Sequence, residues 1–361
     1  MISTFLKKIL YSFPAHFLPF IIILGFYIDK VLGQVVEFHS IYDAIDKSTI
    51  DPTQLADCTI GLEYNANKNC ILEFEAPEDM EPPIMIYYEL DNFHQNHRFY
   101  SRSRDEFQLA GRVTDRDPTY EAMCEPLVRL GSKTLNPCGV TANSFFNDKI
   151  DLISGIDDQG NDLFMNEQGI AWQSDLEYKF KMPDGFRMTE CPMEDCSTDG
   201  NATNCCDDLG FSCDAPVISK EDGLCYAFDY PEANTTQYLY QTYPDIISPL
   251  EHVTNEHFVV WMRIATRPRF RKLYGWIDQK IPKGQTFSFQ ISANFVVESF
   301  KGHKALIITT TSLFGGKNQM LGLTFYCLGF IFLFFGVFIA IKHWFKPRKI
   351  ASRKYLYYKE E

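Results

Sequence analysis

The sequence predicts a membrane protein in which two transmembrane helices flank a large, disulfide-bonded ectodomain, mainly antiparallel β and sandwich-like. Three observations of the 361 residues support this fold class. Uncharged segments long enough to cross a bilayer lie near both ends of the chain. Ten of the eleven cysteines lie between these segments, and so do several short runs of alternating apolar residues.

The second uncharged segment is the stronger membrane span. Met320–Ile341 contains no charged residue, and a helix of that length reaches ~33 Å, enough for a hydrocarbon core of ~30 Å. Basic residues are concentrated after it. The positive-inside rule therefore places residues 342–361 in the cytoplasm and the ectodomain, residues 29–318, outside or in a lumen. We expect the span at residues 319–341.

The first uncharged segment, residues 9–28, follows a short basic head of residues 1–8. It could be a signal peptide or a membrane anchor. Its apolar run exceeds the usual ~7–15 residues of a signal peptide, and no small-x-small cleavage site follows Ile28. The sequence therefore favours a retained first span with both chain ends in the cytoplasm.

The charge and cysteine content indicate an acidic, oxidised ectodomain. The chain carries a formal net charge of −13 although its head and tail are basic, so the ectodomain as a whole should bind neither nucleic acid nor an anionic lipid surface. An even number of external cysteines predicts disulfides, and Cys327 is expected to be a buried apolar residue of the second span. Two sequons predict glycosylation at Asn201 and Asn234.

The external cysteines form two groups. Cys58 with Cys70, and Cys124 with Cys138, are close in sequence, so a bond within either pair would close a short loop, contributing ~3 kcal/mol. The other six lie in a polar stretch with few apolar residues, which predicts a disulfide-stapled insertion at about residues 191–225. Its connectivity stays open, because six cysteines allow fifteen pairings. These six are Cys191, Cys196, Cys205, Cys206, Cys213 and Cys225.

Four runs alternate in hydropathy and are rich in β-branched and aromatic residues, which predicts strands. Pro, Gly, Asn and Asp separate them, as in antiparallel sheets with tight turns. The runs are Ile84–Leu90, Phe258–Ile264, Thr286–Ser292 and Ala305–Thr311.

Two features suggest surfaces for a partner. Gly322, Gly329 and Gly336 recur every seven residues within the second span, and such a stripe allows another helix to approach closely. A second feature is a basic and aromatic stretch in an otherwise acidic domain. Its side chains favour either interfaces and phosphate headgroups, or internal ion pairs and cation–π contacts. Its basic residues are Arg263, Arg267, Arg269, Arg271 and Lys272.

No recognisable catalytic, cofactor or metal constellation is present, so we expect neither enzyme activity nor a cofactor. An ectoenzyme anchored at both ends therefore lacks support.

Several segments resemble the cell-division-control-protein-50, or ligand-effect-modulator, family, whose members are accessory β subunits of phospholipid-flipping P-type ATPases. They occur in family order from about Cys58 to the end of the second span. The matching segments are 87–105 (YYELDNFHQNHRFYSRSRD), 136–148 (NPCGVTANSFFND), 169–172 (GIAW), 255–263 (NEHFVVWMR), 270–275 (FRKLYG) and 309–318 (TTTSLFGGKN).

The resemblance implies a non-catalytic subunit that pairs with a P-type ATPase, is required for its assembly, export from the endoplasmic reticulum and lipid transport, and meets membrane lipids. It implies residence in the secretory pathway: endoplasmic reticulum, Golgi, endosome or plasma membrane. By motif it pairs Cys58 with Cys70 and Cys124 with Cys138, and it favours contact between the glycine stripe and the ATPase.

The chain departs from the family pattern in its short head and in the six-cysteine insertion. A different class, a two-span ligand-gated channel with a cysteine-rich ectodomain, is the alternative. Such a channel needs a polar pore lining, and the second span offers only Thr324, Tyr326 and Cys327, which argues against conduction.

Overall fold

The computed structural model describes residues 21–50, 58–64, 66–112, 122–193, 196, 214–220 and 222–345. The chain divides into two compact units. One comprises residues 38–308 and is mainly β. The other combines the two ends of the chain, residues 1–37 and 309–361, and its described part contains two helices.

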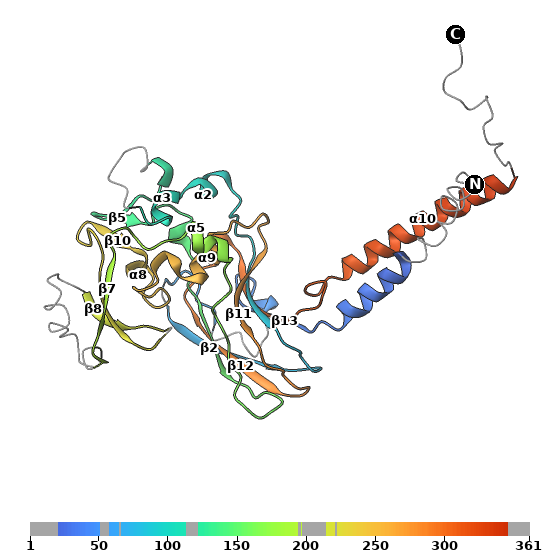
Figure 1. Ribbon diagram of the computed structural model, residues 1–361, viewed down its shortest axis with the longest axis horizontal. Coiled ribbons are helices and arrows are strands. Elements are labelled where there is room, and N and C mark those ends of the chain that lie inside the picture. Colours follow the sequence, from blue (N-terminus) through green and yellow to red (C-terminus); the bar gives the residue numbers. More distant parts are fainter. Residues whose placement is uncertain are drawn as a thin grey trace, which may run out of the picture. The chain divides into compact units, whose positions relative to one another are not determined.

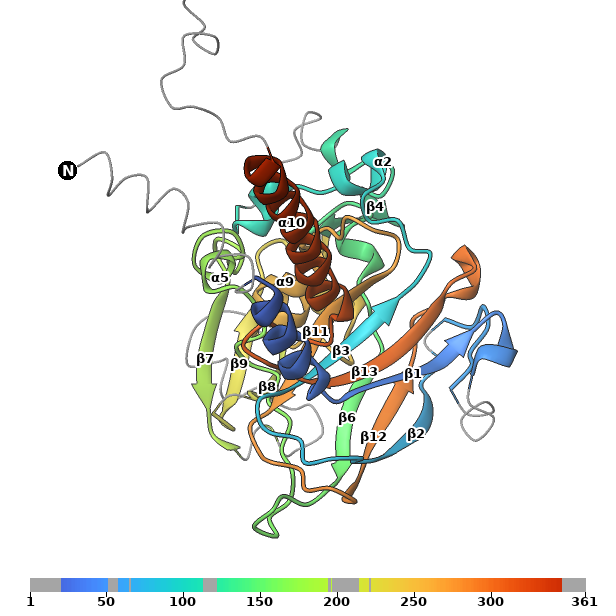
Figure 2. The ribbon, with the colours of Figure 1, turned by 90° about the vertical axis from the view of Figure 1, so that its right-hand side faces the viewer.

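The described residues of the β unit form four small sheets (Figures 1 and 2). The largest has the strand order β1-β13-β3-β11, and the others have the orders β2-β12-β6, β7-β9-β8 and β10-β5-β4. The strands are β1 (Glu37–Ala44), β2 (Lys68–Glu75), β3 (Ile84–Leu90), β4 (Arg129–Leu130), β5 (Lys133–Asn136), β6 (Lys149–Ser154), β7 (Arg187–Cys191), β8 (Asp214–Ile218), β9 (Cys225–Asp229), β10 (Thr236–Tyr238), β11 (Phe270–Ile277), β12 (Thr286–Ala293) and β13 (His303–Thr310).

Most of the neighbouring strands run antiparallel, as the sequence predicts. Antiparallel pairs join β3 to β11, β12 to both β2 and β6, β9 to both β7 and β8, and β4 to β5. The pair β5–β10 is parallel. Three of the four predicted strand runs are confirmed, as β3, β12 and β13.

The fourth predicted strand is wrong, because most of Phe258–Ile264 belongs to helix α9 (Glu256–Met262). The Asn255 side chain accepts a hydrogen bond from the Phe258 amide and caps the helix N-terminus. The buried side chains recur at helical spacing over residues 258–262. The other α-helices whose bounds the structure gives in the β unit are short: α2 (Arg98–Arg102), α3 (Glu106–Leu109), α5 (Gln173–Tyr178) and α8 (Leu239–Thr242).

Aromatic side chains join the two central sheets into one core. Phe38 of β1 contacts Phe74 of β2 and Phe287 of β12, with ring centroids 5.4 and 5.9 Å apart. Tyr42, Phe287 and Phe289 are fully buried. Burial of such side chains stabilises a fold by ~1.5–3 kcal/mol each, so the contact between these two sheets is a main source of stability.

An ion pair lies inside this core. Lys304 of β13 is fully buried and donates to Asp148 (2.8 Å) and to the carbonyl of Phe295 (2.7 Å). Asp148 also accepts hydrogen bonds from the Tyr42 hydroxyl (2.8 Å) and from the Asn294 amide (2.6 Å). These bonds satisfy both charges, so removing either partner would leave an uncompensated charge in the core.

Disulfides link Cys58 to Cys70 and Cys124 to Cys138, the two pairs that the family resemblance implies. In the predicted insertion, Cys196 bonds to Cys225, and Cys191 is also disulfide-bonded. The segment begins at the end of β7, contains β8 and ends at the start of β9, and these three strands form one sheet. Cys205, Cys206 and Cys213 lie outside the described residues.

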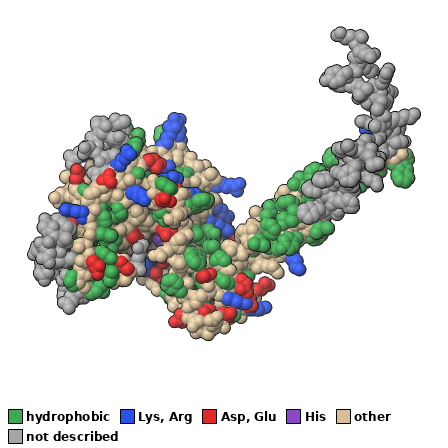
Figure 3. Space-filling model, in the orientation of Figure 1, with side chains coloured by type: hydrophobic (Ala, Val, Ile, Leu, Met, Phe, Trp, Pro, Cys, Tyr) green, Lys and Arg blue, Asp and Glu red, His purple; other side chains and the backbone are tan. Residues whose placement is uncertain are grey.

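The second unit contains α10 (Gln319–Phe345), and Met320–Ile339 within it is long and apolar enough to cross a membrane. Only 11% of the residues in its apolar window are buried, and Figure 3 shows hydrophobic side chains gathered along its surface. Cys327 is a free, exposed cysteine on α10, so the prediction that it is buried was wrong: among the described residues, no group covers it. Residues 21–33 form the described part of another helix, and residues 9–20 of the predicted first span lie outside the described residues.

Candidate functional site

The predicted glycine stripe lies between the two helices of the terminal unit. A Cβ atom at Gly329 would lie 2.5 Å from Cγ1 of Ile22, and one at Gly322 would lie 3.1 Å from Cβ of Asp29. Gly25 is equally close to α10, where a Cβ would lie 3.2 Å from Cβ of Phe325. A side chain at Gly329 would force the neighbouring helix to shift, and one at Gly322 or Gly25 would require the neighbour to move by a few tenths of an ångström. The two helices therefore pack closely where side chains are missing.

The chain's own helix therefore makes the close approach at Gly322 and Gly329. The order of these contacts shows that helix 21–33 runs antiparallel to α10, because Ile22 lies opposite Gly329 and Asp29 opposite Gly322. Gly336 lies on the same helix, one heptad further along. Contact between the glycine stripe and a helix of a partner protein stays a prediction.

The basic stretch surrounds a buried carboxylate. Glu89 of β3 is 2% exposed, and three side chains reach its carboxylate: Arg269 (2.8 Å), Arg271 (3.1 Å) and His39 (2.9 Å). A ring nitrogen of His303 lies 3.7 Å away. Burial alone would raise the pKa of Glu89, but hydrogen bonds from the histidines and arginines hold the pKa well below its usual range. The cluster therefore keeps the buried Glu89 carboxylate negatively charged between two arginines and two histidines.

Lys272 binds three backbone carbonyls and does not take part in the cluster around Glu89. Its ammonium group donates to the carbonyls of Val260 (2.9 Å) and Trp261 (3.0 Å) and to that of Arg263. These carbonyls belong to the C-terminal end of α9, where a cation satisfies orphan acceptors and opposes the helix dipole. Burial and the nearby charge of Arg263 lower the pKa of Lys272 to about 7.

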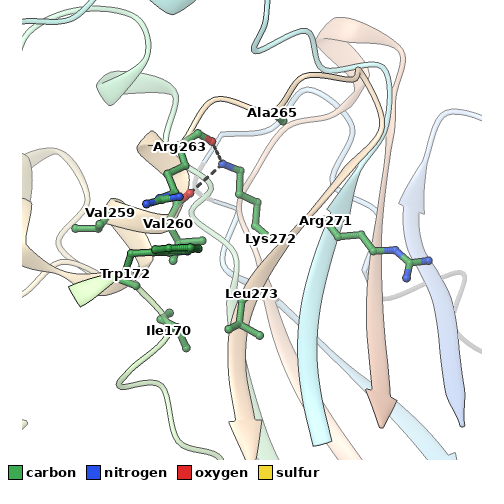
Figure 4. Close-up of a pocket in the computed structure, with 10 residues that line it drawn as sticks. Ile170, Trp172, Val259, Val260, Arg263, Ala265, Arg271, Lys272 and Leu273 are labelled. Atoms are coloured by element: carbon green, nitrogen blue, oxygen red, sulfur yellow. Dashed lines mark hydrogen bonds between the residues drawn. The ribbon is translucent and has the colours of Figure 1, made fainter. Parts of the chain in front are cut away.

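Arg263 lies at the rim of a pocket of about 330 Å³. Its guanidinium group lies 4.5 Å from the ring centre of Trp172 and donates to Asp175 at 2.7 Å. Figure 4 shows Arg263 above the Trp172 ring, Lys272 directed toward the carbonyls of Val260 and Arg263, and Arg271 directed away from all of them. Trp172 remains 65% exposed, so the pocket presents an aromatic surface bordered by a cation that is already paired.

Four of the five predicted basic residues are thus engaged within the domain, through the ion pairs and cation–π contacts that the sequence left as one of two alternatives. Arg267 differs from the other four. It is exposed and makes no hydrogen bond or ion pair within the part of the chain that the structure describes. Sequence reasoning missed Glu89 as the centre of the cluster, although a carboxylate inside the apolar run Ile84–Leu90 is a signal that it is paired.

Of the two predicted glycosylation sites, Asn234 lies exposed in a turn before β10, and Asn201 lies outside the described residues. In the described part of the chain, no three His, Cys, Asp or Glu side chains are grouped so that they could hold a metal ion.

The comparisons with known proteins place these features in a family context. Residues 31–349 match the family described as LEM3 (ligand-effect modulator 3) / CDC50. Cell cycle control protein 50A of Mus musculus is 32% identical over 337 residues, which are 90% of this chain and 82% of that protein.

Two further relatives come from a plant and a fungus. ALA-interacting subunit 3 of Arabidopsis thaliana is 30% identical over 88% of this chain and 75% of its own length. The phospholipid-transporting ATPase accessory subunit CDC50 of Chaetomium thermophilum is 29% identical over 87% of this chain and 69% of its own length. Because one family match covers nearly the whole chain, the protein belongs to the LEM3/CDC50 family.

Proposed function

We propose that this chain is a non-catalytic accessory subunit of a phospholipid-flipping P-type ATPase. The family match over residues 31–349 carries the proposal, together with relatives named as accessory subunits of phospholipid-transporting ATPases. The chain would supply binding surfaces and the ATPase would supply catalysis. The two form a heterodimer in the membrane.

In this proposal both helices of the terminal unit cross the bilayer, and both chain ends are cytoplasmic. The close packing at Gly25, Gly322 and Gly329 supports a preformed helix pair. The β unit then lies on the luminal or extracellular side, where disulfides such as Cys58–Cys70 form and persist. There it contacts the external loops of the ATPase, in a compartment of the secretory pathway or at the plasma membrane.

The β unit suits such a role because its charged groups are already paired inside a rigid scaffold. Glu89 fixes Arg269 and Arg271, and Lys272 holds the end of α9. Rigid scaffolds lower the entropy cost of forming an interface. Arg267 is the member of the basic stretch that remains available for a partner's carboxylate or for a lipid headgroup.

Uptake of a fluorescent phospholipid from the outer leaflet tests the proposal in cells that lack this chain and its relatives. We expect the ATPase to be retained in the endoplasmic reticulum and uptake to be lost, and expression of the full chain to restore both. Unchanged uptake and unchanged ATPase location without the chain would contradict the proposed role.

A further inference from the structure

The turn immediately before α10 carries two apolar residues at its tip. Ser312 and Gly315 exchange two backbone hydrogen bonds of 2.9 Å, and the Ser312 hydroxyl donates to the Gly315 carbonyl at 2.8 Å. Gly315 has a φ of +94°, which closes the turn in a conformation that favours glycine. Leu313 and Phe314 are thus fixed at the two central positions, where turns of water-exposed loops carry Gly, Pro, Asn, Asp or Ser.

Leu313 does not pack against the protein. Its side chain is 89% exposed, more than any other large hydrophobic side chain in the described part of the chain. Full burial of a leucine is worth ~1.5–3 kcal/mol, and Leu313 gains almost none of it at this position of the hydrogen-bonded turn. A rigid turn that presents leucine outward indicates an apolar environment outside the protein.

The contacts of Phe314 place the turn beside the helix pair. Its ring lies 6.3 Å from that of Tyr27. Tyr27 precedes Asp29 by two residues, a rise of ~3 Å along the helix, and Asp29 lies opposite Gly322 near the start of α10. The turn therefore lies alongside the first turns of the apolar segment of α10, at the end from which the β unit's strand β13 arrives.

The surface next to the turn has the pattern of a membrane interface. Met320 and Leu323, in the first turns of α10, are 68% and 50% exposed. Residues 311–316 contain no charged side chain, and Lys317 follows them. An apolar surface bordered by a lysine that can extend its ammonium group to the headgroups is typical of segments lying at the bilayer boundary.

We propose that the turn of residues 312–315 inserts its tip into the bilayer leaflet on the ectodomain side, with Leu313 in contact with phospholipid acyl chains. The inserted turn would act with the two helices as a third point of attachment to the membrane. It would fix the depth of the start of α10 relative to the lipid headgroups. The proposal takes α10 as a membrane span and does not depend on which ATPase is bound.

Spin labelling of the full chain in phospholipid nanodiscs tests the proposal, both for the chain alone and for its complex with a co-purified ATPase. A nitroxide is attached at Leu313→Cys in a Cys327→Ser background, because Cys327 is free and exposed. Lys317→Cys, four residues later and also exposed, is the matched control. The Cys327→Ser chain without an added cysteine gives the background labelling. Collision rates with oxygen, which concentrates in lipid, are compared with those of a water-soluble nickel complex.

We expect oxygen collisions to dominate at position 313 in both preparations and nickel collisions to dominate at position 317. Nickel collisions dominating at position 313 would place the tip in water and overturn the proposal. A label at position 313 that loses collisions with both reagents in the complex would show that the ATPase covers the tip, which would also overturn it. Because the chain alone gives a readout, failure of the ATPase to co-purify would count against the proposed function and not against this inference.

Discussion

At the scale of single residues, paired charges explain most of what the basic stretch does. The sequence shows five cations in an acidic domain, but it cannot show which face of a strand each one occupies in the tertiary fold. Arg271 and Lys272 are neighbours on β11 and point to opposite sides, one to Glu89 and the other to the end of α9. Glu89 is 182 residues from Arg271 in sequence, and Val260 is 12 residues from Lys272, so the pattern of neighbouring residues does not reveal either contact.

Glu89→Gln should destabilise the β unit by ~1–3 kcal/mol, because a neutral amide leaves part of the hydrogen-bonding capacity of Arg269 and Arg271 unmet. Both arginines are partly exposed, which limits the loss. Thermal unfolding at neutral pH measures it. Glu73→Gln on the exposed side of β2 is the matched control, and an equal change in both variants would contradict the role of Glu89.

The same residue predicts a pH dependence. The folded-state pKa of Glu89 lies below the unfolded value of ~4.3, so its stabilisation is complete above that pH and declines as the pH falls below it. Between pH 5 and pH 3 the unmodified chain should therefore lose more stability than Glu89→Gln. Parallel stability curves for the two chains would show that the carboxylate is not held in its charged form.

Arg267→Glu should weaken recovery of the ATPase with the chain and leave the unfolding temperature of the β unit unchanged, because this side chain has no partner among the described residues. The measurement compares co-purified ATPase with melting temperature. Lys283→Glu, at an exposed turn, controls for a general effect of charge. Full recovery of the ATPase with Arg267→Glu would remove this residue from the interface.

At the scale of elements, short runs rich in β-branched and aromatic residues predict β3, β12 and β13 correctly, although β13 is buried at seven of its eight positions and does not alternate. The same pattern fails at α9, because five apolar residues in a row fit either a buried strand or a short helix. The helix is stabilised at its N-terminus by the Asn255 side chain, which accepts a hydrogen bond from the Phe258 amide, and at its C-terminal end by Lys272, which donates to the Val260 carbonyl. Lys272 lies ten residues beyond the last residue of α9, so the sequence of the helix itself gives no sign of this contact.

Gly329→Leu should separate helix 21–33 from α10, because even a Cβ atom there would lie 2.5 Å from Ile22. We expect lower yield and lower thermal stability of the full chain in mild detergent, and consequently less recovered ATPase. Gly33→Leu is the control, since a Cβ atom at Gly33 meets nothing within 4 Å. Normal yield and stability of Gly329→Leu would show that this close packing is dispensable.

At the scale of the whole molecule, the order of motifs along the chain identifies the family, and composition and topology signals predict a β-rich ectodomain next to an apolar C-terminal helix. The insertion is less predictable. Six cysteines permit many pairings, and the Cys196–Cys225 bond depends on β9 lying beside β7, a nonlocal pairing of strands. Surfaces that bind a partner are also hard to predict from sequence, because only the fold shows that apolar side chains such as Trp172 and Leu313 are exposed.

This chain and a phospholipid-flipping ATPase are expected to function together as one complex. Affinity purification of the tagged full chain in mild detergent, with identification of stoichiometric partners, tests this expectation most directly. We expect one polytopic P-type ATPase to be recovered per chain. A homotrimer of this chain without any ATPase would contradict the role of accessory subunit and favour the ligand-gated channel.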